Sequence, residues 1–221
     1  MKKHLSCLLL LALTYSFSSL ALAEKNSDNK EKIKRWPTAT YMLGSDASFI
    51  SVGLGGWQDE GKTFQNIYIS HFEVEDTLKV NGVNLGKQEY SSTRLGVFAD
   101  TFSYDDTPKK SPPVALSGGA FIYKNESEGP IDRYGIGVTM HLGHLLTPKT
   151  KAYLGADVML EPFSTNWDAN AFLEYDFQAG LTQRVTSFLD IMAIYRKGGS
   201  WDARTDSSHY SVALAGLRVA F

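Results

Sequence analysis

This sequence of 221 residues has a single cysteine, a formal net charge of only −2 and few long apolar runs. The single cysteine, Cys7, leaves the chain without an intramolecular disulfide or a cysteine-ligated metal site. The 22 basic and 24 acidic residues nearly cancel and form no long basic block, so no nucleic acid partner is expected. After the first 23 residues, no run approaches the roughly 18 apolar residues of a membrane-spanning helix. If the protein lies in a membrane, we expect it to cross as strands.

The first 23 residues have the pattern of a cleaved secretory signal peptide. Lys2 and Lys3 precede a mostly apolar stretch over 5–22, and Ala21-Leu22-Ala23 is the small-x-small pattern that signal peptidase requires. Cys7 lies inside the stretch rather than at the cleavage point, which does not suggest a lipoprotein. The predicted organisation is a signal peptide at 1–23, a polar periplasmic lead-in at 24–37 and one β-domain at 38–221.

From Thr38 onward the apolar residues recur with a period of two, which is typical of strands. Over 167–181, for example, Leu173, Tyr175 and Phe177 alternate with Glu174 and Asp176. Successive side chains of a strand point to opposite faces, so such a strand has one apolar and one polar face. Ten candidate strands are predicted at 38–43, 48–57, 64–74, 90–104, 114–124, 133–145, 151–160, 167–181, 187–197 and 207–221.

Strands with one apolar face fit either a soluble β-sandwich or a membrane barrel with its apolar face toward lipid. The length of the strands favours an all-β, antiparallel transmembrane β-barrel of ten strands, with eight as the alternative. An even count places both termini of the barrel domain on the same side, which we expect to be the periplasmic side. The turns at 57–63, 105–113, 146–150 and 182–186 are then periplasmic, and the mostly longer loops at 75–89, 125–132, 161–166 and 198–206 lie outside. Aromatic belts at the lipid boundary are predicted from Trp57, Tyr68, Phe72, Tyr134, Trp167, Tyr175 and Tyr195.

The chain ends on an aromatic residue, Phe221, which is expected on the same strand face as the apolar residues before it. Leu217, Val219 and Phe221 share that face, and the segment resembles the last strand of bacterial outer-membrane barrels. The resemblance implies that these three residues are an assembly signal read by the barrel-assembly machinery. It further implies a location in the outer membrane of a Gram-negative bacterium, with lipid and lipopolysaccharide as partners.

The polar parity of the strands predicts a charged lumen. A narrow barrel cannot leave buried charges unpaired, so we expect a salt-bridge network that fills the lumen. A polar passage for small solutes is the alternative, because ten strands lie near the size at which a barrel interior opens. The residues predicted to face the lumen are Arg94, Asp100, His141, Asp157, Glu174, Asp176, Asp190, Arg196 and Arg218.

Neither a cofactor nor a metal site is predicted. The pair His141 and His144 lies three residues apart, which places the two rings on opposite faces of a strand. His209-Tyr210-Ser211 is similar to the His-x-Ser pair of lipid A deacylases of the PagL type, in which histidine would act as a base on serine. Neither Asp nor Glu follows within 212–221 to orient the histidine. An enzyme of this class is therefore the least favoured of the three functions.

The last 90 or so residues resemble the YfaZ-like family of small outer-membrane proteins. The resemblance lies in Arg133-Tyr134-Gly135-Ile136-Gly137, Leu173-Glu174-Tyr175, Ile194-Tyr195-Arg196-Lys197 and the closing Phe221. It implies a barrel and a location, and it brings no catalytic residues. The sequence thus favours a non-enzymatic barrel of structural or surface-interaction type, then a narrow porin-like channel, then a lipid A-modifying enzyme.

Overall fold

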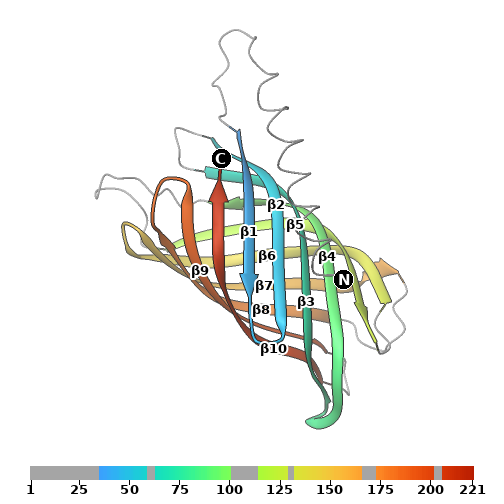
Figure 1. Cartoon of the computed structure of the whole chain (residues 1–221). Helices are drawn as coiled ribbons and strands as arrows, with labels where there is room; N and C mark the ends of the chain where they lie inside the picture. The colour runs from blue at the N-terminus through green and yellow to red at the C-terminus, as the bar shows by residue number, and fades with distance from the viewer. Residues whose placement is uncertain (1–34, 59–62, 101–113, 129–131, 166–172, 202–205) are drawn as a thin grey trace, which may run out of the picture.

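The structure, a computed structural model, describes residues 35–58, 63–100, 114–128, 132–165, 173–201 and 206–221. These residues form ten antiparallel strands that close into a barrel in which strands adjacent in sequence are adjacent in space (Figure 1). The predicted fold class is therefore confirmed, and the strand number is ten rather than eight. The strands are β1 (Arg35–Leu43), β2 (Ala47–Gln58), β3 (Thr63–Val80), β4 (Val83–Asp100), β5 (Val114–Ser127), β6 (Asp132–Thr147), β7 (Thr150–Thr165), β8 (Leu173–Arg184), β9 (Leu189–Trp201) and β10 (Asp206–Ala220).

The two ends of the barrel differ. β1 begins and β10 ends at one end, here called the terminal end; the opposite end is called the distal end. β1 and β2 are short, and β3 pairs directly with β10 beyond their turn, Val80 with Ser207 and Lys79 with Ser208. The ring of described strands therefore counts ten at the terminal end and eight, β3 to β10, at the distal end. The alternative of eight strands thus has a physical counterpart at the distal end.

The side chains sort by face as the alternation predicts. On β8, Phe177 and Leu181 are exposed on the outside, whereas Glu174 and Asp176 are buried inside. The same division holds on β4, β6, β7 and β9, where the outward positions are large apolar residues. An apolar exterior around a polar interior is the arrangement of a barrel surrounded by lipid.

The segment 75–89, predicted as an outer loop, is instead a continuation of β3 and β4 into a long hairpin (Figure 1). The two strands meet in a two-residue turn at Asn81 and Gly82, whose φ angles are 51° and 79°. Asn-Gly is the favoured pair for such a turn because both positions need a positive φ. The loop prediction was wrong because the charged residues on the hairpin outweighed this turn signal.

The remaining boundaries shift by a few residues. β1 begins at Arg35, inside the predicted lead-in, and β7 runs to Thr165, through most of the predicted loop at 161–166. The predicted signal peptide and the part of the lead-in before Arg35 lie outside the described residues, as do 101–104 and 167–172 of two predicted strands. Of the predicted belt aromatics, Tyr134 and Tyr195 are exposed on the outside, but Phe72 is buried inside the barrel.

Beyond the β1–β2 turn, one carboxylate connects β3 to β10 where the two strands are not yet paired. Asp76 of β3 accepts hydrogen bonds from the backbone N–H of Ser211 on β10, at 2.8 Å, and from that of Thr77, at 2.6 Å. Gly44 in the β1–β2 turn lies so close to β10 that a Cβ there would stand 2.5 Å from the carbonyl oxygen of Ala213. The short hairpin is thus wedged between β3 and β10.

Replacement of Asp76 by alanine should loosen this junction. We expect Asp76→Ala to lower the free energy of unfolding by about 1 kcal/mol, because a charged acceptor is lost from two backbone donors. Amide hydrogen exchange should become faster at Ser211. Glu75→Ala is the matched control: Glu75 contacts the exposed Lys87 at 3.5 Å, and removal of an exposed ion pair should change stability little. Equal effects of the two variants would contradict the bridging role.

Candidate functional site

The interior of the barrel carries most of the buried polar groups of the described residues. The ion pairs of its charged side chains lie at three levels, and Lys151 is buried near the terminal end. The distal level contains Arg133 and Glu174, the middle level contains Arg94, Asp157, Asp176 and Arg196, and the terminal level contains Arg184, Asp190 and Arg218.

The middle level is a closed set of two carboxylates and two guanidinium groups. Asp157 on β7 and Asp176 on β8 are directly opposite each other in the strand register, an arrangement in which like charges repel. Arg94 donates to both carboxylates, to Asp157 and, at 3.3 Å, to Asp176. Arg196 donates to Asp176. The two positive charges compensate the two negative ones within a buried layer.

Aromatic rings complete this layer. The guanidinium carbon of Arg196 lies 4.0 Å from the centre of the Phe72 ring, and that of Arg94 lies 4.8 Å from the centre of the Phe121 ring. A cation over an aromatic face within about 6 Å is attracted by the ring quadrupole. Gln178 adds a hydrogen bond of 2.9 Å to Asp157. Polar and apolar side chains together therefore fill this level of the lumen.

The distal level is built around Glu174. The Tyr90 hydroxyl donates to Glu174 at 3.1 Å, and Arg133 donates to the other carboxylate oxygen at 3.3 Å. The ring of His209 stacks parallel to that of Tyr90, with 5.9 Å between ring centres. Asn125 is fully buried nearby on β5, in register with Arg133. Both His209 ring nitrogens and the Asn125 carbonyl oxygen are buried without a hydrogen-bond partner.

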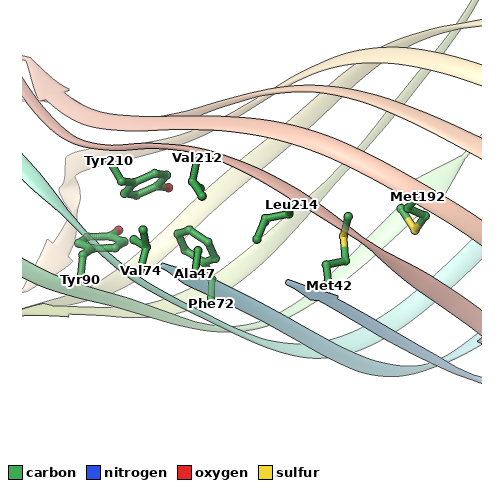
Figure 2. Packing of buried hydrophobic residues seen from close by; sticks show 9 residues of the cluster. All are labelled: Met42, Ala47, Phe72, Val74, Tyr90, Met192, Tyr210, Val212 and Leu214. Atoms are coloured by element: carbon green, nitrogen blue, oxygen red, sulfur yellow. The ribbon is translucent and has the colours of Figure 1, made fainter. Parts of the chain in front are cut away.

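A cluster of apolar side chains, here called the apolar cluster, lies in the lumen beside β1, β2, β3, β4, β9 and β10. Figure 2 shows its members pointing toward one another inside the barrel: Met42, Ala47, Phe72, Val74, Tyr90, Met192, Tyr210, Val212 and Leu214. The sequence reasoning did not predict it, because it assigned the lumen to the polar parity. The signal was present in 208–214, where Tyr210, Val212 and Leu214 share a parity.

At the terminal level, Asp190 accepts a hydrogen bond of 3.0 Å from Arg218 and lies 3.5 Å from Arg184. Between this level and the middle level lies a cavity of about 190 Å³. Its lining combines polar groups, among them Arg94, Asp157 and Arg196 at its distal side and Arg218 toward the terminal end, with apolar side chains that include Met42, Met192 and Leu214 of the apolar cluster. Side chains therefore fill the distal and middle levels of the lumen, and a cavity remains toward the terminal end.

The structure brings together most of the residues predicted to face the lumen. Arg94, Asp157, Asp176 and Arg196 form one network, Glu174 joins Arg133, and Asp190 joins Arg218. His141 lies apart from these ion pairs, stacked on Tyr153 with 5.1 Å between ring centres, in the wall of the cavity. The side chain of Asp100 lies outside the described residues. The sequence reasoning missed Arg133, which is 2% exposed and among the largest fully buried side chains.

His209 and Ser211 do not form the pair that the resemblance to lipid A deacylases suggests. The register between β9 and β10 shifts between Ser208 and Tyr210, and this irregularity turns both His209 and Tyr210 into the barrel. Ser211 faces outward, where its hydroxyl lies 2.6 Å from that of Tyr195. His209 and Ser211 would share one face of a regular strand, but simple alternation does not hold across such a bulge.

The C-terminal residues lie on the outer face. Leu217 and Phe221 are exposed, Val219 is half-buried between them, and the Phe221 N–H donates to the Pro37 carbonyl at 2.9 Å. Among the described residues, no helix is long and apolar enough to span a bilayer. The same residues contain no group of three or more His, Cys, Asp or Glu side chains placed to hold a metal ion.

No family model and no curated protein matches the sequence, so the resemblance to the YfaZ-like family stays a prediction. Several solved membrane barrels are similar in structure. They include OmpT of Vibrio cholerae (12% identity, TM-score 0.37, 86% of this chain and 62% of that chain), the KdgM porin in complex with disordered oligogalacturonate (6%, 0.36, 84% and 99%) and Neisserial surface protein A (13%, 0.32, 85% and 94%). This chain thus spans less than two thirds of the OmpT chain. The fold assignment rests on the strand pairing described above.

Proposed function

We propose that the protein is an outer-membrane β-barrel with both chain termini in the periplasm and a lumen closed to solutes. The apolar exterior supports the membrane location. Large apolar side chains on it are about half or more exposed, among them Ile67, Val97, Leu142, Leu154 and Leu181. Soluble proteins rarely expose apolar surface of this extent. Export and an antiparallel barrel together favour the outer membrane. In this proposal, its partners are lipid, lipopolysaccharide and the barrel-assembly machinery that reads Phe221.

The observation that carries the closed lumen is the buried middle level together with the apolar cluster. The side chains of Asp157, Asp176 and Arg196 are 3%, 1% and 4% exposed, so little solvent reaches them from either end. A charge placed between these groups would have to break ion pairs in a poorly hydrated layer, which costs several kcal/mol. The barrel then acts as a scaffold, and its work lies at its surfaces rather than in transport or catalysis.

The distal end is the surface that this proposal assigns to interaction. The β3–β4 hairpin projects there past the β1–β2 turn (Figure 1). Its tip carries Val83 and Leu85, which are 61% and 56% exposed. Exposed apolar residues on a projecting hairpin are a feature of contact surfaces.

A narrow channel for small hydrophilic solutes is the second candidate, and the cavity in the terminal half favours it. Because this cavity already carries polar groups in its wall, a channel would require the middle and distal levels to open. A lipid A-modifying enzyme has less support, since His209 and Ser211 face opposite sides of β10.

Single-channel recording in a planar bilayer separates the two candidates. For protein whose folding is verified by a heat-dependent gel shift, we expect no discrete current steps. The charge-balanced double variant Arg94→Ala, Asp157→Ala should show brief steps, because it removes the ion pair that spans β4 and β7. Arg218→Ala, at the terminal level, is the control and should stay silent. Reproducible steps in the unmodified protein would replace the closed barrel with the channel.

A further inference from the structure

We propose that the terminal mouth, the opening of the lumen at the terminal end, binds a dissolved divalent oxyanion of the phosphate class through Arg184 and Arg218, beside Lys151. Such a site goes beyond the closed barrel proposed above, because an anion at the mouth needs no passage through the middle and distal levels. The placement of these side chains, the balance of their charges and the exposure of the two guanidinium groups support it.

The strand register places the basic side chains beside one another. Arg184 on β8 is directly opposite Asp190 on β9, which is directly opposite Arg218 on β10. Lys151 on β7 is opposite Thr182, which lies two residues from Arg184 on the same face of β8. Diagonal neighbours of this kind are within reach of long side chains. The four charged residues therefore form one arc across four adjacent strands.

Basic side chains outnumber acidic ones in this arc by three to one. Asp190 accepts a hydrogen bond of 3.0 Å from Arg218 and lies 3.5 Å from Arg184, so one carboxylate faces two guanidinium groups. Lys151 adds a third positive charge to the lumen wall. The ion pairs of the middle level contain two groups of each sign, and those of the distal level contain one of each. The arc thus has a surplus of two positive charges that the other levels do not share.

The surroundings of the arc strengthen the field of this surplus. The outer faces of the same four strands carry exposed apolar side chains, among them Leu154, Leu181, Ile191 and Leu217. A hollow lined by charges of one sign between walls of low dielectric constant raises the local concentration of counter-ions. Anions are therefore drawn to the terminal mouth, whereas cations are repelled and neutral solutes gain nothing.

The exposure and geometry of the two arginines suit an oxyanion. The side chains of Arg184 and Arg218 are 26% and 34% exposed, so a solute at the mouth can reach them. A guanidinium group can donate two parallel hydrogen bonds to a phosphate or carboxylate. A phosphate group carries a charge of about −1.5 to −2 at pH 7, which matches the surplus of the arc better than a single carboxylate does.

The test is a titration of the refolded protein with inorganic phosphate, followed by NMR through the Nε–H signals of the arginine side chains. An uncharged maltoside detergent is used, and sodium chloride keeps the ionic strength constant, because salt screens exposed charges. We expect saturable shifts at Arg184 and Arg218 with phosphate and weaker binding of acetate, which carries one charge. Lys151→Gln should weaken phosphate binding about two- to fivefold.

Asp190→Asn should instead strengthen phosphate binding about two- to fivefold, because it removes the carboxylate that competes for both arginines. A gain in binding cannot result from a loss of folding. Lys124→Gln is the matched control: it removes one positive charge at an exposed position on the outer face of β5, 2.7 Å from Glu126, and should leave phosphate binding unchanged.

Two outcomes would overturn the site itself: shifts that do not saturate or are equal for acetate, and weaker phosphate binding in Asp190→Asn. Phosphatidylglycerol added to the micelles distinguishes a lipid headgroup from a dissolved anion. We expect no competition with phosphate, because the two arginines reach Asp190 inside the barrel, and competition would overturn the assignment to a dissolved anion. Phosphate binding is measured without any current, so its failure leaves the closed lumen to be judged by the bilayer recordings.

Discussion

Replacement of Asp176 by alanine is expected to lower the free energy of unfolding by about 3–5 kcal/mol, the largest effect predicted for a single lumen residue. Asp176 accepts hydrogen bonds from both Arg94 and Arg196 in a layer with almost no solvent. Without it, two guanidinium groups share the single carboxylate of Asp157, and one positive charge stays buried without compensation. Urea unfolding in detergent, followed by the gel shift, measures the loss.

A matched control separates charge from packing. Asp190→Ala removes a carboxylate at the terminal level, where its partner Arg218 is 34% exposed, so water can replace the lost partner and the cost should be about 1 kcal/mol. The double variant Asp176→Leu, Arg196→Met should recover most of the stability lost in Asp176→Ala, because it removes both charges and keeps similar volumes. A double variant no more stable than Asp176→Ala would show that the ion pair itself, rather than the uncompensated charge, dominates.

Replacement of His209 by phenylalanine is expected to stabilise the barrel by about 1–3 kcal/mol. Both ring nitrogens of His209 are buried without partners, and a phenyl ring keeps the stacking on Tyr90. His209 lies on the distal side of Ser211, beyond the outward apolar residues of β10. Tyr90→Phe is a control, because it keeps the ring but removes the hydroxyl that donates to Glu174.

The gain from His209→Phe should depend on pH. Burial lowers the pKa of His209; the negative charge of Glu174 acts in the opposite direction, and the positive charge of Arg133 adds to the lowering. A histidine whose pKa is lower in the folded state destabilises that state as the pH falls below its unfolded value of about 6.5. The stability of the unmodified protein should therefore fall between about pH 7 and pH 5 more steeply than that of the variant. Parallel pH profiles would contradict the burial of His209.

The sequence was sufficient for the strands and their faces wherever one parity was apolar and the other polar. In 173–177, Leu173, Tyr175 and Phe177 alternate with Glu174 and Asp176. This pattern predicts that the two carboxylates point into the lumen, and both are buried there. In 67–74 both parities carry apolar residues, so Phe72 was expected outside although it lies in the apolar cluster. Alternation gives no orientation where the interior itself is partly apolar.

The pairing of charges could not be predicted for a different reason. Parity places Arg94 and Asp157 in the lumen, but their contact joins β4 and β7, which are not neighbours in the sheet. Which side chains meet across a lumen depends on the tilt of the strands and on their register. The bulge near His209 shifts that register within β10. The position of such an inserted residue could not be recognised from the pattern of apolar and polar residues in the sequence.

The direct pairing of β3 with β10 has a consequence for the order of assembly. A contact between Val80 and Ser207 closes a shorter chain loop than one between β1 and β10, and shorter loops lose less conformational entropy on closure. The eight strands from β3 to β10 can therefore meet first at the distal end. The β1–β2 hairpin would then insert last, and the absence of a side chain at Gly44 lets its turn approach the Ala213 carbonyl, from which a Cβ would stand only 2.5 Å away.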